Sequence, residues 1–400
     1  MSGLFVVRQP VYTRTQHVFG YKIAFQSFVE DETDAAANEA KEVLDAIIEI
    51  GFDNLVGPRH ALIAMPRALL SKGDALPLPK DRTIIELHDY DEVDETLLTT
   101  VTSLVNKGYL LALADFVLKD PMSPLLEFAQ IVKLRVEAMD ERQLSRQVRA
   151  LKRFEHLKLL AAGVQTQEKY AFCRELGMNY FEGNFFACPK RIKRKRLAAN
   201  KLVIVQLLAA LQQPKVLVPQ LEALISKDVA LSYKLLRYIN SAFFGLPRPV
   251  ESIQRAIVFL GTDAIQKWAT LLALARFDEK PSELMVTAVV RARMCELLAS
   301  ELGEGDEDVA FTAGLLSVLD ALLDLPMNEV VKLLTLSDKL NRALLRGEGL
   351  AGEVLYSVLS YEAQQWNSVV LTGLSPEFIK DAYVQSLSWA GDACRMLTVE

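Results

Sequence analysis

The hydrophobic period changes halfway along this 400-residue chain, and this change constrains the fold more than any other feature. In the first half, short apolar runs alternate with amphipathic helical segments, whereas the second half shows helical periods alone. Strand–helix alternation over about 190 residues predicts a parallel sheet with crossovers, as an α/β sheet or a barrel. We therefore predict an α/β domain followed by an all-α domain, each long enough to bury a core.

Apolar runs and capping residues place the individual elements. The predicted buried strands cover residues 4–7, 61–64, 83–87, 110–114, 131–134 and 158–161. In the second half, Asp228, Ser252 and Thr262 are helix-capping residue types that precede apolar periods, and Gly261 is typical of a helix end. The predicted domains are 1–189 and 201–400, joined by a basic linker at 190–200.

Charge and cysteine usage narrow the function classes. The net charge of −6 gives no general attraction to nucleic acid or to anionic membranes, and no apolar stretch reaches the length of a membrane span. The four cysteines lack CxxC spacing, and we expect no signal peptide, so we expect a cytoplasmic protein. Six of the eight residues at 189–196 are basic. This run is read as a solvated linker, with a clamp for an acidic partner or nucleic acid as the alternative.

Several fragments of the first half, in order, resemble one family. The opening RQPVYTRTQHVFGYKIAFQS and the later ALIAMPRALL, TIIELHDY, LALADF, IVKLRV, LLAAGVQT and LGMNYFEGNFFACP resemble EAL domains, which hydrolyse the second messenger cyclic di-GMP. The resemblance implies a TIM-like β/α barrel with its chemistry at the C-terminal strand ends. It also implies a mechanism in which carboxylates and an amide hold two divalent metals that activate water.

The resemblance also identifies where the family's metal-binding and acid–base side chains would fall. Ligand positions are occupied by Lys22, Ala64 and Ala114, and a later glutamate position by Ala162, so charge and coordination are lost together. We therefore expect no metal, no cofactor and no catalytic residue. The pocket expected from this comparison comprises Lys22, Ala64, Glu86, Asp89, Ala114, Asp115, Lys133, Ala162 and Glu182.

The retained charged groups of this pocket allow two interpretations. Glu86, Asp115 and Lys133 are expected to pair with one another as relics of the family site. In the alternative interpretation they form a metal-free nucleotide site, in which Lys133 and Arg135 contact phosphates.

The second half resembles a different family. The stretch ISKDVALSYKLLRYINSAFFGLPRPVESIQRAIVFLGTDAIQKWA resembles HDOD domains, over roughly residues 196–337. HDOD domains are relatives of HD phosphohydrolases without the metal ligands, and the second half of this chain contains no histidine. The turn after 228–238 gathers polar and apolar groups. Its candidate partner-binding residues are Asn240, Ser241, Phe243, Phe244 and Leu246.

Both resemblances together predict a catalytically inactive signalling scaffold that acts through protein–protein contacts and is not an enzyme. The alternatives are a metal-free cyclic di-GMP receptor and a residual cyclic di-GMP phosphodiesterase. Candidate partners are signalling proteins, a second copy of the chain and cyclic di-GMP. Neither a membrane nor nucleic acid is expected as a partner.

Overall fold

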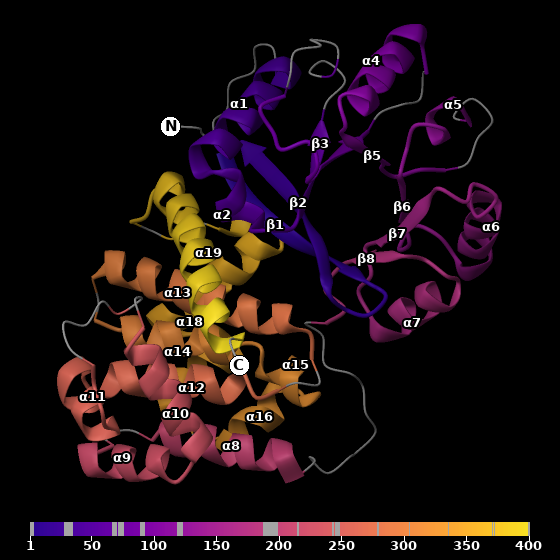
Figure 1. Ribbon diagram of the computed structural model, residues 1–400. Coiled ribbons are helices and arrows are strands. Elements are labelled where there is room, and N and C mark those ends of the chain that lie inside the picture. The colour runs from indigo at the N-terminus through magenta and orange to yellow at the C-terminus, as the bar shows by residue number, and fades with distance from the viewer. Residues whose placement is uncertain are drawn as a thin grey trace. The chain divides into compact units, whose positions relative to one another are not determined.

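The computed structural model divides the chain into two compact units, Met1–Phe186 and Ala187–Glu400, which we describe separately (Figure 1). The structure describes residues 4–27, 35–65, 70, 76–88, 93–117, 123–186, 199–213, 216–241, 244, 249–277, 280–303, 305–334, 336–369, 371 and 373–398. Most of the expected basic linker lies outside these residues.

The first unit is a closed barrel of eight strands in the order β1 to β8. All neighbouring pairs from β2 to β8 are parallel, whereas β1 is antiparallel to both β2 and β8. The strands are β1 (Leu4–Thr13), β2 (Val18–Ser27), β3 (His60–Met65), β4 (Thr83–Leu87), β5 (Leu110–Leu113), β6 (Ile131–Arg135), β7 (Lys158–Ala162) and β8 (Tyr180–Glu182).

The barrel confirms the predicted fold class, with one local difference. Each of the six apolar runs lies in a strand except for Ala114, which comes directly after β5, and β2 and β8 complete the barrel. The antiparallel β1 arises because a tight turn joins it to β2 without a crossover helix. In that turn the amide of Gln16 donates to the carbonyl of Thr13, and Gln16 has a positive φ of 67°.

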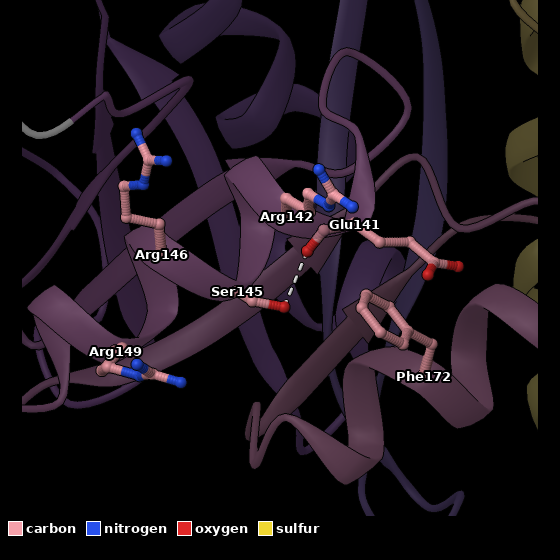
Figure 2. A pocket seen from close by; sticks show the side chains of 6 residues that line it. All are labelled: Glu141, Arg142, Ser145, Arg146, Arg149 and Phe172. Atoms are coloured by element: carbon pink, nitrogen blue, oxygen red, sulfur yellow. Dashed lines mark hydrogen bonds between the residues drawn. The ribbon is translucent and has the colours of Figure 1, made fainter.

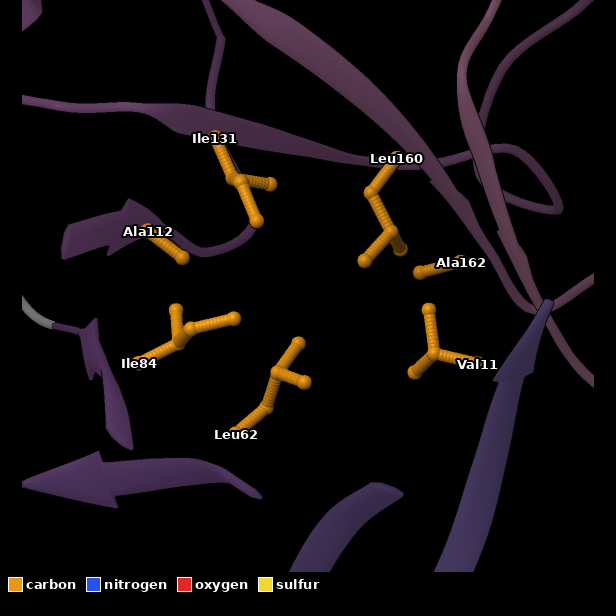
Figure 3. Close-up of a cluster of buried hydrophobic side chains, with 7 residues drawn as sticks. All are labelled: Val11, Leu62, Ile84, Ala112, Ile131, Leu160 and Ala162. Atoms are coloured by element: carbon orange, nitrogen blue, oxygen red, sulfur yellow. The ribbon is translucent and has the colours of Figure 1, made fainter. Parts of the chain in front are cut away.

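The interior of the barrel is filled by aliphatic side chains from six strands. Side chains alternate between the two faces of a strand, so every second residue points inward. Figure 3 shows the resulting cluster, whose side chains point toward one another across the barrel. Its members are Val11, Leu62, Ile84, Ala112, Ile131, Leu160 and Ala162.

Helices lie in most of the described connections between the parallel strands of the barrel. Asp94, Asp140 and Thr166 each accept a hydrogen bond from a backbone N–H in the first turn of a helix. The helices are α1 (Ala35–Ile50), α2 (Phe52–Val56), α4 (Glu95–Asn106), α5 (Ser123–Leu126), α6 (Glu141–Leu151) and α7 (Gln167–Glu175).

The second unit is all helical in its described part, as predicted. Asp228 and Ser252 cap α10 and α11, and Gly261 with a φ of 88° separates α11 from α12. The elements are α8 (Ala199–Leu211), α9 (Val218–Ser226), α10 (Val229–Ile239), α11 (Ile253–Leu260), α12 (Thr262–Leu274), α13 (Ser282–Leu302), α14 (Glu307–Leu316), α15 (Leu319–Leu323), α16 (Met327–Leu334), α17 (Asp338–Arg346), α18 (Gly349–Glu362), the 3-10 helix η2 (Trp366–Ser368) and α19 (Pro376–Thr398).

Among the described residues, no single helix has both the length and the apolar character to span a membrane. One pair of helical segments, Glu307–Leu323 and Met327–Leu334, reaches that length and composition together, but it is bent by 112°.

Candidate functional site

The candidate site lies one step beyond the aliphatic layer, toward the C-terminal ends of the parallel strands. Because side chains two residues apart share a strand face, Glu86 follows Ile84 and Lys133 follows Ile131 on the inner face. Glu182, the last residue of β8, is also buried. The alternation therefore carries charged groups into the barrel mouth directly above an apolar floor.

Two lysines and two glutamates form a connected charge cluster in this mouth. Lys133 Nζ lies 3.2 Å from Glu86 Oε1 and 2.7 Å from Glu182 Oε2. Lys22 Nζ lies 3.6 Å from Glu182 Oε1, and its side chain is 25% exposed, whereas that of Lys133 is 5% exposed. Two positive and two negative groups balance in charge, and Lys22 is the member most accessible to a ligand.

Ionisation of the buried pair follows from this arrangement. Burial is the largest single influence on Glu86 and disfavours its charged form, but Lys133, His88 and Lys22 together outweigh it, and the pKa of Glu86 falls from 4.5 to about 2. Burial likewise opposes the charge on Lys133, but Glu86 and Glu182 raise its pKa above the ordinary value. Both groups are therefore charged at neutral pH, and Glu86 cannot donate a proton there.

His88 is a member of the mouth that the sequence analysis did not select. Its Nε2 lies 3.7 Å from Glu86 Oε2, and within the described part of the chain neither atom has a hydrogen-bond partner. The signal was present in the sequence, because His88 follows Glu86 by two residues.

Asp115 does not join the Glu86–Lys133 pair, contrary to the expectation. Its carboxylate instead accepts hydrogen bonds from Arg135, with Arg135 Nε 3.1 Å from Oδ1 and Nη2 in contact with Oδ2. Both side chains are substantially exposed. Asp115 has a positive φ of 50° directly after β5, and Arg135 is the last residue of β6. This second ion pair therefore leaves Arg135 already engaged rather than free to contact phosphate.

The alanines of the expected pocket lie on the same inner faces. Ala64, Ala114 and Ala162 follow Leu62, Ala112 and Leu160 by two residues, and Ala64 is exposed while the other two are buried. Asp89 lies outside the described residues. Small side chains at these positions add no charge to the cluster of two lysines and two glutamates.

The donor set does not fit a divalent metal centre. Within the described ranges, no three histidine, cysteine, aspartate or glutamate side chains come together as metal ligands. Lysine ammonium groups already neutralise both buried carboxylates, whereas a divalent cation needs several free oxygen ligands.

In the helical unit, Asn240 of the expected partner-binding set is hydrogen-bonded to Val250. Asn240 Nδ2 donates to the carbonyl of Val250 (2.8 Å), and the Val250 amide donates back to Asn240 Oδ1 (2.7 Å). Phe244 packs edge-on against Tyr238 and Trp268, with centroids 5.3 Å and 5.7 Å apart. Ser241 is half-buried.

Phe243 and Leu246 lie outside the described residues. The contacts described above hold Asn240 and Phe244 on the helical unit, and a partner-binding role for these residues stays a prediction.

Comparison with known proteins supports the expected organisation. Residues 197–338 match the HDOD domain family, so the helical unit carries an HDOD domain. The cyclic di-GMP phosphodiesterase CdgJ of Vibrio cholerae is 29% identical, covering 99% of this chain and 94% of CdgJ. The uncharacterized protein YuxH of Bacillus subtilis is 25% identical, covering 96% of this chain and 98% of YuxH.

Solved EAL structures resemble the barrel unit. A standalone EAL protein of Vibrio cholerae in its c-di-GMP-bound form is 17% identical, with a TM-score of 0.35, and covers 45% of this chain and 89% of its own. The FimX EAL domain of Pseudomonas aeruginosa bound to c-di-GMP is 15% identical, with a TM-score of 0.37, and covers 46% of this chain and 89% of its own.

The expectation of a catalytically inactive scaffold that is not an enzyme is contradicted. CdgJ matches this chain along almost its whole length and is named a cyclic di-GMP phosphodiesterase. The expectation rested on alanines and a lysine at positions taken from the EAL family. The residues at those positions do not determine the whole site, because Glu86, Lys133 and Glu182 still place charged groups at the barrel mouth.

Proposed function

We propose that this protein is a cyclic di-GMP phosphodiesterase that binds its substrate at the mouth of the barrel. The observation that carries the proposal is the match to CdgJ over 99% of this chain, through both the barrel and the helical unit. A cytoplasmic location and a protein partner remain part of the proposal.

The charged groups of the mouth suit a phosphodiester. Lys22 is partly exposed and only loosely paired with Glu182, so its ammonium can turn toward a phosphate oxygen. Lys133 holds Glu86 and Glu182 in place beneath it. A phosphate beside Lys22 would free Glu182 Oε1 to orient water, while Glu182 Oε2 stays paired with Lys133. Hydrolysis adds one water across one P–O bond, and the cyclic dinucleotide opens to a linear one with the proton on the released 3′ oxygen.

The proposal predicts turnover that depends on Lys22. Purified full-length protein with cyclic di-GMP is expected to give linear dinucleotide above a buffer control, measured by chromatography with and without Mn²⁺. Lys22→Met is expected to lower the rate by about 10- to 100-fold, because it removes a charged donor to the phosphate. Calorimetric titration of the same samples reports binding separately from chemistry.

Lys158→Met is the matched control. Lys158 is exposed at the beginning of β7, the end of the strand remote from the mouth, so its loss is expected to leave turnover unchanged. Binding without product would refute the phosphodiesterase activity but keep the binding site. Equal rates for the Lys22 and Lys158 variants would remove Lys22 from the site.

A further inference from the structure

A second charged feature lies on the outside of the barrel, between α6 and α7. It is a groove of about 440 Å³, and Figure 2 shows the side chains that surround it. Its lining residues are Glu141, Arg142, Ser145, Arg146, Arg149 and Phe172.

The three arginines form a row along α6. Arg142, Arg146 and Arg149 are spaced i, i+4 and i+7, which places them on one face over about 10 Å at a rise of 1.5 Å per residue. All three are exposed. Their guanidinium groups make no hydrogen bond or ion pair with any residue that the structure describes. The row therefore presents three exposed guanidinium groups whose N–H donors can bind a ligand.

The helix that carries the three arginines, α6, is held in place by packing and by its N-terminal cap. The opposite face of α6 buries Leu144, Val148 and Leu151, and a capping box between Asp140 and Gln143 holds its first turn. A row on such a helix loses little backbone freedom when it binds, which favours affinity.

Phe172 of α7 completes the groove with a half-buried aromatic ring. Ser145 adds no free donor, because its hydroxyl donates to the carbonyl of Glu141 (2.7 Å). The groove therefore offers charge along α6 and an apolar contact beside it.

The segment that contains the row is positively charged, whereas the chain as a whole is negatively charged. Residues 141–153 contain five basic residues and one acidic residue, whereas the whole chain has a net charge of −6. Arginine also differs from lysine here, because its planar guanidinium can bind a carboxylate through two parallel hydrogen bonds, as a bidentate pair. The row is thus complementary to carboxylates with a matching spacing.

We propose that this groove docks an acidic helical segment of a partner protein, with carboxylates at i, i+4 and i+7 facing the arginines and an apolar side chain against Phe172. A small nucleotide fits less well, because ligand sites of that kind enclose most of their ligand and these arginines stand open to solvent. Duplex nucleic acid fits less well because it would need a broader basic footprint than one row beside Glu141.

The test uses the full chain and a defined probe. The probe is a fluorescein-labelled helical peptide with glutamates at i, i+4 and i+7 and one leucine beside them. Fluorescence anisotropy is expected to show binding that weakens from about 0.05 to 0.5 M salt. The variant Arg142→Glu, Arg146→Glu, Arg149→Glu is expected to bind at least about 10-fold more weakly.

Two controls separate patterned recognition from general charge attraction. A peptide of the same composition with its glutamates spread around the helix is expected to bind about 10-fold more weakly than the patterned one. The variant Lys227→Glu, Lys234→Glu, Lys332→Glu makes the same charge change at exposed residues of the helical unit and is expected to bind normally.

Three outcomes would overturn the proposal. They are equal binding of both peptides, unchanged binding by the arginine variant, and tighter arginine-dependent binding of a DNA duplex or of phosphatidylglycerol vesicles. Thermal melting of each variant is expected to match that of the native protein, because the substituted residues are exposed.

Discussion

Lys133→Met is expected to lower the free energy of unfolding of the barrel by about 3–5 kcal/mol, because it leaves Glu86 as an uncompensated buried charge. Glu86 is fully buried, and the nearest charged nitrogen to its carboxylate is Lys133 Nζ at 3.2 Å. Methionine keeps most of the volume of lysine but none of its charge. Thermal and denaturant unfolding of the purified variant measure the loss.

The pH dependence gives this prediction a second readout. In the native protein the pKa of Glu86 is lowered to about 2, so its contribution to stability is complete above 4.5 and is lost as the pH falls toward 2. Without Lys133, burial dominates and the folded-state pKa of Glu86 moves above its unfolded value. The variant then gains stability from protonation as the pH falls, so the difference from the native protein should narrow between pH 7 and 4.

Two further variants test the cause. Lys22→Met removes a partly exposed lysine 3.6 Å from Glu182 and is expected to cost about 1 kcal/mol or less. Adding Glu86→Met to Lys133→Met removes the stranded charge and should recover much of the lost stability. If the Lys133→Met variant melts at the same temperature as the native protein, the Lys133–Glu86 ion pair does not contribute to the stability of the barrel.

The elements that the sequence predicted are those with a strong local signal. Buried parallel strands such as β5 and β7 read as almost continuous apolar runs, and the caps Asp228 and Ser252 place helix starts directly. In strand β2 the apolar residues are interrupted by Gly20 and Lys22, and β8 has only three residues, so neither has the apolar run that marked the other strands.

The site was predicted as a set of positions and not as a set of contacts. Alternation fixes the face on which Glu86, Lys133 and Glu182 lie, but distances between them depend on the strand register and tilt of the closed barrel. For this reason the partner of Asp115 was predicted wrongly. The expectation of inactivity was wrong for a different reason. The loss of metal-binding side chains at positions known from EAL domains was taken to mean that the activity was lost as well.

Gly183→Ala is expected to destabilise the barrel by about 4 kcal/mol, since an added Cβ would combine backbone strain with a collision. Gly183 has a φ of 142°, and a Cβ there would lie 2.1 Å from the carbonyl oxygen of Val164. This approach is close because the Val164 amide donates to the carbonyl of Glu182 across the β7–β8 seam (2.9 Å). The alanine must therefore open this seam or move the end of β8, which carries Glu182 into the charge cluster.

Gly108→Ala separates the two contributions. Gly108 also has a positive φ, of 94°, but a Cβ there would meet no atom within 4 Å, so only the backbone strain of about 1–2 kcal/mol is expected. The melting temperature should fall by about 10 °C for Gly183→Ala and by a few degrees for Gly108→Ala. The Gly183 variant should also lose cyclic di-GMP binding in calorimetry, because Glu182 shifts, whereas the Gly108 variant should keep it. Equal melting temperatures would show that the backbone at Val164 and Gly183 can move apart with little loss of stability. The position of Glu182 would then be determined by other contacts in the barrel.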